Sequence, residues 1–319
     1  KKTEGTSIVV LSARPKETSK EYKLPPKARG VCSARKLSCI FKAGQQNKIK
    51  AVNRNNIFAV IREIYRCDIL MSSGGLLQDK TSNRSILYYL TLIFFGIIFK
   101  KRVVLFSYGI GPIKSLINRW LVKKILNKVH LITLRDKESA NALKKIGVNR
   151  PEIKVTADAV FALDLPKSRK KRKSKFTAGI AIRKFKDHEY FIKSIRESCE
   201  DLKINFVFLP FQPAEDGIFR MDKKKLINEI ASLDLTIGAR YHSLILSSMF
   251  NIPFIGINYD DKIANFCGLM KKDLINLDKN SFKNNLKSSI IKQLRSIKKT
   301  GYDTRKLKGS VKKSFKLIF

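Results

Sequence analysis

The run Gly238-Ala-Arg-Tyr-His-Ser243 holds two side chains that could bind an anion and move a proton. Arg240 offers a planar fork of N–H donors that suits phosphate or carboxylate, and His242 can exchange protons near neutral pH. A helix is expected directly afterwards, over Ser243–Phe250, and a helix N-terminus favours anions. A structural histidine is the alternative, but a place beside Arg240 favours the functional interpretation. We therefore predict an anion site with Arg240 and His242 as catalytic residues and Ser243 as a substrate contact.

Two glycine-rich turns are further candidates for ligand binding. One is Ser72-Ser-Gly-Gly75 and the other is Gly109-Ile-Gly-Pro112, and each follows an expected strand. Glycines let the backbone N–H groups come close to a ligand. The candidate substrate-binding residues are Ser73, Gly74, Gly75, Gly109 and Gly111. Tight strand-to-helix turns would need the same glycines, and Pro112 suits the first turn of a helix, so a structural role stays open for both turns.

Arg135 and Arg183 also come directly after expected strands, and both are predicted to bind substrate. With the two glycine-rich turns and the Arg240 turn, they make five motifs at carboxyl ends of strands. Open parallel sheets bind ligands outside those ends. We therefore expect the five motifs to line one rim of a substrate cleft.

The elements that would position these motifs are short, β-rich runs alternating with helical patterns. Several runs are continuously apolar, which is typical of central parallel strands covered on both faces. The sequence therefore predicts an α/β fold with parallel sheets. The expected strands are Ile8–Ser12, Asp68–Ser72, Arg102–Tyr108, Val129–Leu134, Thr177–Ile182, Ile204–Leu209, Leu233–Ile237 and Pro253–Asn258.

Helix signals lie between the expected strands. Leu116–Lys128 repeats apolar residues at helical spacing, Asp136 can cap the next helix, and Gly147 can close it. An amphipathic helix is also expected near the C-terminus, with one apolar face formed by Phe282, Leu286, Ile290, Leu294 and Ile297.

A chain of 319 residues is long enough for two domains. The basic run Pro166–Lys175 has no apolar periodicity and lacks interleaved aromatics, so a solvated linker is favoured over a nucleic-acid motif. We expect an N-terminal domain over 1–165, this linker over 166–175, and a C-terminal domain with a basic helical tail over 176–319. Pro25–Lys48 has no clear period and is expected to be an insertion or an irregular loop.

The composition narrows the class of partner. Lys and Arg total 66 against 26 acidic residues, which gives a formal charge of +40 and predicts attraction to phosphorylated substrates, polyanions or anionic lipid. Five cysteines without a CxxC pair argue against a disulfide framework or a zinc site and fit a reducing cytoplasm. The apolar run Ile86–Phe99 is shorter than the roughly 20 residues that span a bilayer, so a buried or membrane-touching helix is expected.

Other catalytic classes lack their motifs. The sequence contains no HxxxH, no DxD pair and no clustered Cys and His, so no metal site is predicted. It contains no GxSxG elbow, which leaves serine-hydrolase chemistry without support.

Taken in order, the motifs resemble those of a known family. The runs DILMSSGGLLQD, VVLFSYGIGP, LITLRDKESANALKKIGV, VTADAVFAL, GIAIRKF, FVFLPFQ and LTIGARYHSLILSSMFNIPFIGINYD resemble the polysaccharide pyruvyl transferases of the CsaB type. The resemblance extends from about Ile49 to Tyr259. It implies two Rossmann-like domains in a GT-B-like arrangement, and transfer of pyruvate from phosphoenolpyruvate to sugar hydroxyls as a ketal in cell-wall polysaccharide biosynthesis.

The resemblance also implies roles for residues. Arg135 matches the donor-binding arginine of the family's RD-x-x-S motif, Arg240 and His242 match its R-x-H motif, and Ser73–Gly75 matches its glycine-rich turn. Phosphoenolpyruvate is a small anion, so Arg135 and Arg240 are expected to hold its phosphate and carboxylate. His242 is expected to act as a general acid or proton shuttle, and no cofactor beyond the donor is required.

The sequence departs from the family at two places. The glycine-rich first turn is missing, and the segment Pro213–Ser232 is shorter than its counterpart. An inactive, truncated family member is therefore one alternative, and a GT-B-like glycosyltransferase that uses a nucleotide sugar is another. A non-catalytic basic protein that binds nucleic acid or membrane ranks last, because basic composition does not explain the motifs, and no nucleic-acid partner is expected.

The acceptor is expected to be a cell-wall glycan or a lipid-linked saccharide. A lipid-linked anionic acceptor would suit both the basic surface and the apolar run Ile86–Phe99. These features predict a cytoplasmic protein that associates peripherally with the inner, anionic face of the membrane.

Overall fold

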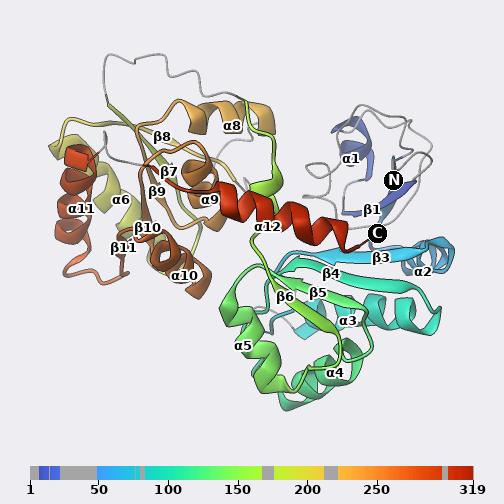
Figure 1. Cartoon of the computed structure of the whole chain (residues 1–319). Helices are drawn as coiled ribbons and strands as arrows, with labels where there is room; N and C mark the ends of the chain where they lie inside the picture. Colours follow the sequence, from blue (N-terminus) through green and yellow to red (C-terminus); the bar gives the residue numbers. More distant parts are fainter. Residues whose placement is uncertain are drawn as a thin grey trace. The chain divides into compact units, whose positions relative to one another are not determined.

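The computed structural model describes residues 7–13, 15–21, 49–75, 77–79, 83–166, 176–211, 222–296 and 301–318. Contacts divide the chain into two compact units. The N-terminal unit comprises Lys1–Asp164 together with Arg305–Phe319, and the C-terminal unit comprises Leu165–Thr304. Both are α/β structures in which every strand pair is parallel (Figure 1).

The N-terminal unit contains a four-stranded sheet in the order β3-β4-β5-β6 and a separate pair, β1-β2. Its elements are β1 (Ile8–Ser12), α1 (Pro15–Glu21), β2 (Ile49–Asn53), α2 (Ile57–Arg66), β3 (Ile69–Ser73), α3 (Asn83–Ile98), β4 (Arg102–Tyr108), α4 (Leu116–Leu126), β5 (Leu131–Leu134), α5 (Lys137–Ile146), β6 (Glu152–Val155), the 3-10 helix η2 (Ala159–Ala162) and α12 (Arg305–Lys316). The strand β4 is buried from Val103 to Tyr108, as expected for a central strand covered on both faces.

Local signals in the sequence explain where the helices of this unit begin and end. The side chain of Asp136 accepts from the Ser139 N–H and caps α5, and Gly147 closes the same helix with a φ of 86°. Both roles were predicted, and both are confirmed. The helix α4 begins at Leu116, capped by Ser115, so Pro112 precedes the helix and does not lie in its first turn.

The C-terminal unit contains a five-stranded sheet in the order β11-β10-β9-β7-β8. Its elements are β7 (Thr177–Ala181), α6 (His188–Asp201), β8 (Asn205–Phe208), α8 (Lys223–Ala231), β9 (Leu235–Gly238), α9 (Tyr241–Met249), β10 (Phe254–Ile257), α10 (Asp261–Met270), β11 (Leu274–Ile275) and α11 (Phe282–Ser296). Phe282, Leu286 and Ile290 of α11 are fully buried in the core of this unit. The predicted apolar face of this helix is confirmed, apart from Ile297, which lies outside the described residues.

All eight expected strands are present, with ends shifted by at most a few residues. Three further strands, β2, β6 and β11, were not expected. Two of them lack the apolar pattern of a buried strand: β6 has the sequence EIKV and is largely exposed at the sheet edge, and β11 has only two residues. The stretches Pro25–Lys48 and 167–175, expected to be a loop and a linker, lie outside the described residues.

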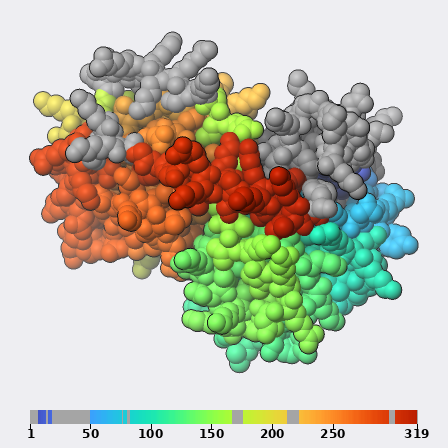
Figure 2. Space-filling model, in the orientation of Figure 1, coloured from blue at the N-terminus to red at the C-terminus, as the bar shows by residue number. Residues whose placement is uncertain are grey.

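The C-terminal helix α12 belongs to the N-terminal unit, which differs from the predicted domain over 176–319. Phe315 packs edge-on against Phe106 of β4, with 5.9 Å between ring centroids, and Lys308 pairs with Asp164 at 2.9 Å. Figure 2 shows the red atoms of α12 against green atoms of this unit. The tail is basic in composition, yet Val311, Ser314 and Ile318 are buried.

Within the described residues, no helix is both long enough and apolar enough to cross a membrane. The run Ile86–Phe99 forms most of α3, which packs one face on the core and leaves its other face exposed.

Candidate functional site

The five predicted motifs do follow strand ends, and they belong to two sheets, one in each unit. The turns after β3 and β4 and the pair Arg135–Asp136 after β5 lie at the four-stranded sheet of the N-terminal unit. Arg183 and the Arg240 turn lie at the five-stranded sheet of the C-terminal unit. Each unit therefore contributes its own set of candidate residues, and each set is described separately.

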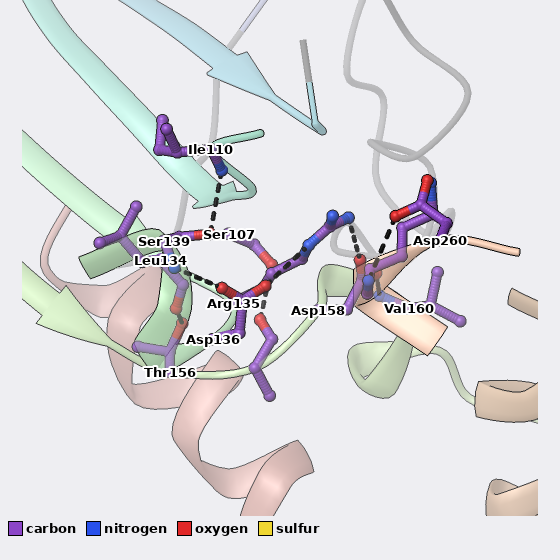
Figure 3. A network of polar contacts seen from close by, with 12 residues as sticks. Ser107, Ile110, Leu134, Arg135, Asp136, Ser139, Thr156, Asp158, Val160 and Asp260 are labelled. Atoms are coloured by element: carbon purple, nitrogen blue, oxygen red, sulfur yellow. Dashed lines mark hydrogen bonds and ion pairs between the residues drawn. The ribbon is translucent and has the colours of Figure 1, made fainter. Parts of the chain in front are cut away.

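Arg135 is the centre of the set in the N-terminal unit. Its backbone N–H donates to the Tyr108 carbonyl at 3.0 Å, which fixes the residue at the end of β5. Its side chain is 11% exposed; Nε donates to the Asp136 carboxylate at 3.2 Å, and one terminal nitrogen lies 3.6 Å from Asp158. Figure 3 shows the guanidinium directed at Asp158. Two carboxylates thus hold a nearly buried cation in one orientation.

The glycines of the predicted binding turns make room for Arg135. A Cβ on Gly109 would lie 2.5 Å from the Arg135 guanidinium, and a Cβ on Gly75 would lie 3.3 Å from it. The Gly109 N–H donates to the Gly74 carbonyl at 3.0 Å, which joins the two turns. The structure therefore brings Gly74, Gly75 and Gly109 together with Arg135.

Gly111 and Ser73 have other surroundings. A Cβ on Gly111 would lie 2.5 Å from Cβ of Gln78, so this glycine permits a close approach of the two turns. Ser73 lines a small internal cavity of about 30 Å³, and its buried hydroxyl has no hydrogen-bond partner among the described residues. The structure brings neither residue against Arg135.

Two residues of the RD-x-x-S motif, Asp136 and Ser139, hold the local structure. Asp136 accepts from the Ser139 N–H at 2.7 Å, and the Ser139 hydroxyl accepts from the Ile110 N–H at 2.9 Å (Figure 3). The start of α5 thereby anchors the Gly109–Gly111 turn. Asp136 and Ser139 therefore have structural roles, whereas the positive charge of Arg135 suits contact with an anion.

Two residues near Arg135 were not predicted. Asp158 is 1% exposed, pairs with Arg135, and caps η2 by accepting from the Val160 N–H at 3.0 Å. The strand that precedes Asp158, β6, was not expected, so the sequence did not mark this carboxylate as lying at a strand end. Ser107 has a φ of 49°, which is strained for a residue with a Cβ, and its buried hydroxyl donates to the Ala157 carbonyl at 2.6 Å. No sequence pattern announces that conformation.

Asp79, four residues after the first glycine-rich turn, holds the start of α4. Its carboxylate accepts from the N–H groups of Lys114 and Ser115, at 3.0 and 2.9 Å, and from the Asn118 amide at 3.3 Å. Burial alone would raise the pKa of Asp79, but these donors outweigh it and lower the pKa. Asp79 thus has a structural role.

In the C-terminal unit, Arg240 is the N-cap residue of α9 and is only 8% exposed. His242 is the second residue of the helix and is half-buried. The helix begins two residues earlier than predicted, so both side chains lie at its N-terminus, where the dipole and the N–H groups favour an anion.

The neighbouring Gly238 and Ser243 keep this turn compact. The Ser243 hydroxyl donates to the Arg240 carbonyl at 2.6 Å and is fully buried. A Cβ on Gly238 would lie 2.6 Å from that hydroxyl. Ser243 therefore positions the Arg240 backbone, which is a different role from the predicted contact with substrate.

Arg183 follows β7 and stacks on an aromatic ring. Its guanidinium lies 5.4 Å from the centroid of Tyr259, and the ring of Phe185 lies 5.2 Å from the same ring. Phe185 and Tyr259 line a hollow of about 520 Å³ at the carboxyl ends of β7, β10 and β11, together with Lys186, Asp187, Phe191, Leu277 and Lys279. Flat rings flanked by charges suit a polar ligand with an apolar face.

The chain is similar to known proteins both in sequence and in fold. A family model described as polysaccharide pyruvyl transferase matches residues 5–261. No curated protein matches the chain.

Similar solved structures show the fold. The S. aureus MnaA–UDP co-structure is 14% identical, with a TM-score of 0.61 over 97% of this chain and 94% of that chain. UDP-GlcNAc 2-epimerase from Methanocaldococcus jannaschii is 13% identical, with a TM-score of 0.60 over 97% and 90%. Both are GT-B folds, which confirms the predicted fold class.

Proposed function

Because the chain belongs to the polysaccharide pyruvyl transferase family, we propose that it transfers the pyruvyl group of phosphoenolpyruvate to two hydroxyls of a saccharide. The observation that carries the proposal is the enclosure of Arg135. Two carboxylates orient its guanidinium, and Gly75 and Gly109 leave the space that it occupies. Such a fixed, nearly buried cation suits a small dianionic donor better than a flexible surface lysine would.

Arg240 is the second proposed donor contact. It occupies the N-cap position of α9, so its guanidinium and the N–H groups of the helix can act on the same anionic group. We propose that Arg135 and Arg240 bind the phosphate and the carboxylate of phosphoenolpyruvate, without assigning either group to either residue.

His242 is the proposed proton donor. In the first step, C3 of phosphoenolpyruvate takes a proton and the oxygen of one sugar hydroxyl bonds to C2. That sugar hydroxyl loses its proton at the same time. In the second step, the C2–O bond to phosphate breaks, the second sugar oxygen bonds to C2, and its proton leaves. The products are a ketal and one phosphate. Of the three histidines, only His242 lies beside an arginine at a helix N-terminus, where it can serve as general acid.

The acceptor is proposed to be a cell-wall glycan or a lipid-linked saccharide, as in the CsaB type, and the reaction is proposed to occur on the cytoplasmic side of the membrane. The hollow beside Arg183 is the proposed acceptor subsite. The apolar faces of Phe185 and Tyr259 can stack on a sugar ring, while Lys186 and Lys279 can contact an anionic group.

The alternative is transfer from a nucleotide sugar, because the S. aureus neighbour was solved with UDP. At 14% identity that likeness concerns the fold alone. Calorimetric titration separates the two donors. We expect phosphoenolpyruvate to bind, and binding to weaken in Arg135→Ala and in Arg240→Ala. Saturable binding of UDP or a UDP-sugar, without binding of phosphoenolpyruvate, would favour the glycosyltransferase instead.

A further inference from the structure

Large apolar side chains gather on the outer face of three helices in the N-terminal unit. Eight of the eleven exposed large hydrophobic residues of the described chain lie on α2, α3 and α4. They are Phe58 and Tyr65 of α2, Leu87, Phe94 and Ile98 of α3, and Leu116, Ile117 and Trp120 of α4. Because α3 packs against both α2 and α4, the three helices form one layer (Figure 1). We call this surface the α2–α4 face.

The outer stripe of α3 is the most unusual part of this face. Leu87, Thr91, Phe94 and Ile98 recur at helical spacing and are exposed. A surface helix of a water-soluble domain normally places charged or polar residues there. The opposite side of α3, with Ile86, Leu90 and Ile93, already packs into the core. Folding of the unit therefore does not account for the apolar outer stripe, and contiguous patches of this kind mark interaction surfaces.

The charges of the face have one sign. The three helices are fully described, and their one carboxylate, Glu63, is 7% exposed and pairs with Lys50. Their exposed charged side chains are Arg62, Arg66, Arg84, Lys123 and Lys124. Two lysines also lie over aromatic rings of the face: Lys101 is 5.6 Å from the Tyr65 centroid, and Lys124 is 5.9 Å from the Trp120 centroid.

We propose that the α2–α4 face docks on the surface of an anionic lipid bilayer. Trp and Tyr favour the headgroup region, Leu, Ile and Phe can enter the acyl boundary, and Lys and Arg reach anionic headgroups through their apolar stems. A second copy of the chain fits less well, because a symmetric contact would place the same basic face on both sides. The proposal goes beyond the proposed reaction and does not depend on it.

Vesicle flotation tests the docking without donor or acceptor. The full chain is mixed with vesicles of phosphatidylglycerol and phosphatidylcholine, or of phosphatidylcholine alone, at low and high salt. We expect binding to the anionic vesicles that weakens with salt. The double variant Phe94→Ser/Trp120→Ser should lower the partition coefficient at least about tenfold, because it removes two inserted apolar side chains. Both positions are exposed, at 45% and 57%, so folding should persist.

Leu269→Ser is the matched control, since Leu269 is 64% exposed on α10 of the C-terminal unit and should leave vesicle binding unchanged. Circular dichroism melting checks that each variant is folded. Binding of the double variant equal to that of the unmodified chain would overturn the proposal and assign the attraction to general basicity. Absence of binding at every salt concentration would also overturn it, as would a dimer that the double variant splits and that does not bind vesicles.

Discussion

The guanidinium of Arg135 fills the space that a side chain on Gly109 would need. A Cβ on Gly109 would lie 2.5 Å from Cζ, Nε and a terminal nitrogen of Arg135. Since Gly109 does not have a positive φ, the close approach of Arg135, and not backbone conformation, requires a glycine here. The second glycine-rich turn thus leaves room for Arg135, the proposed donor contact.

Gly109→Ala should displace Arg135 while the fold persists, because the group that must move is the end of a flexible side chain. Loss of a charge-assisted contact should weaken phosphoenolpyruvate binding about tenfold or more. Calorimetric titration measures the affinity. Gly75→Ala, where the added Cβ would be 3.3 Å from Arg135, should have a smaller effect, and Gly268→Ala, with nothing within 4 Å, should have none. Equal effects of the three substitutions would contradict this role for Gly109.

His242→Asn should lower kcat by about 10²- to 10⁴-fold, with KM for phosphoenolpyruvate within a few-fold, because proton transfer and not binding is lost. Phosphate release measured over a range of phosphoenolpyruvate concentrations gives both constants. His130→Asn is the control, because His130 accepts from the Val103 N–H at 3.1 Å in a structural contact. A kcat of His242→Asn close to that of the control would remove His242 from the mechanism.

Asp79→Asn should destabilise the N-terminal unit by about 1–2 kcal/mol at neutral pH, because the carboxylate accepts from Lys114, Ser115 and Asn118. Its pKa is lowered in the folded state, since these donors outweigh the effect of burial. The stabilisation is therefore complete above the unfolded pKa of about 4 and is lost as the pH falls through the lower folded value. Urea unfolding at neutral and at acidic pH should show the difference between the two proteins shrinking in acid. A difference that does not change with pH would argue against the charge of Asp79 as its source.

Tyr259→Leu should raise KM for the saccharide acceptor several-fold and leave KM for phosphoenolpyruvate unchanged, because it removes one flat face of the hollow beside Arg183. Tyr259→Phe keeps the ring and should behave like the unmodified enzyme. Steady-state kinetics with each substrate varied in turn separates the two constants. An unchanged acceptor KM in Tyr259→Leu would place the acceptor elsewhere.

The parts of the fold that could be predicted are those with strong local signals. The buried strand β4 is a continuous apolar run, and α5 carries both a capping Asp136 and a closing Gly147. The strand β6 has exposed, charged residues, and the basic tail was expected to be helical but not to pack against the N-terminal unit as α12 does. Both elements depend on contacts with distant parts of the chain, which local pattern does not encode.

In the candidate site, too, some residues could be predicted from the sequence and others could not. Arg135, Arg240 and His242 could be proposed from residue type and from their place after a strand. The functions of their neighbours could not, because they arise from tertiary contacts: Gly109 faces Arg135, the Ser243 hydroxyl donates to the Arg240 backbone, and Asp158 pairs with Arg135. Sequence patterns grouped Gly109 and Ser243 as ligand contacts and did not mark Asp158, whereas the structure shows all three positioning the arginines or the turns.

The most direct test of pyruvyl transfer follows both products of the proposed reaction. The full chain is incubated with phosphoenolpyruvate and a saccharide acceptor that contains β-ManNAc, phosphate is measured, and the acceptor is analysed by mass spectrometry and NMR. We predict one phosphate released for each pyruvyl ketal formed, with both products lost together in Arg135→Ala and in Arg240→Ala. Transfer of a sugar from a UDP-sugar to the same acceptor, with phosphoenolpyruvate unchanged, would contradict it.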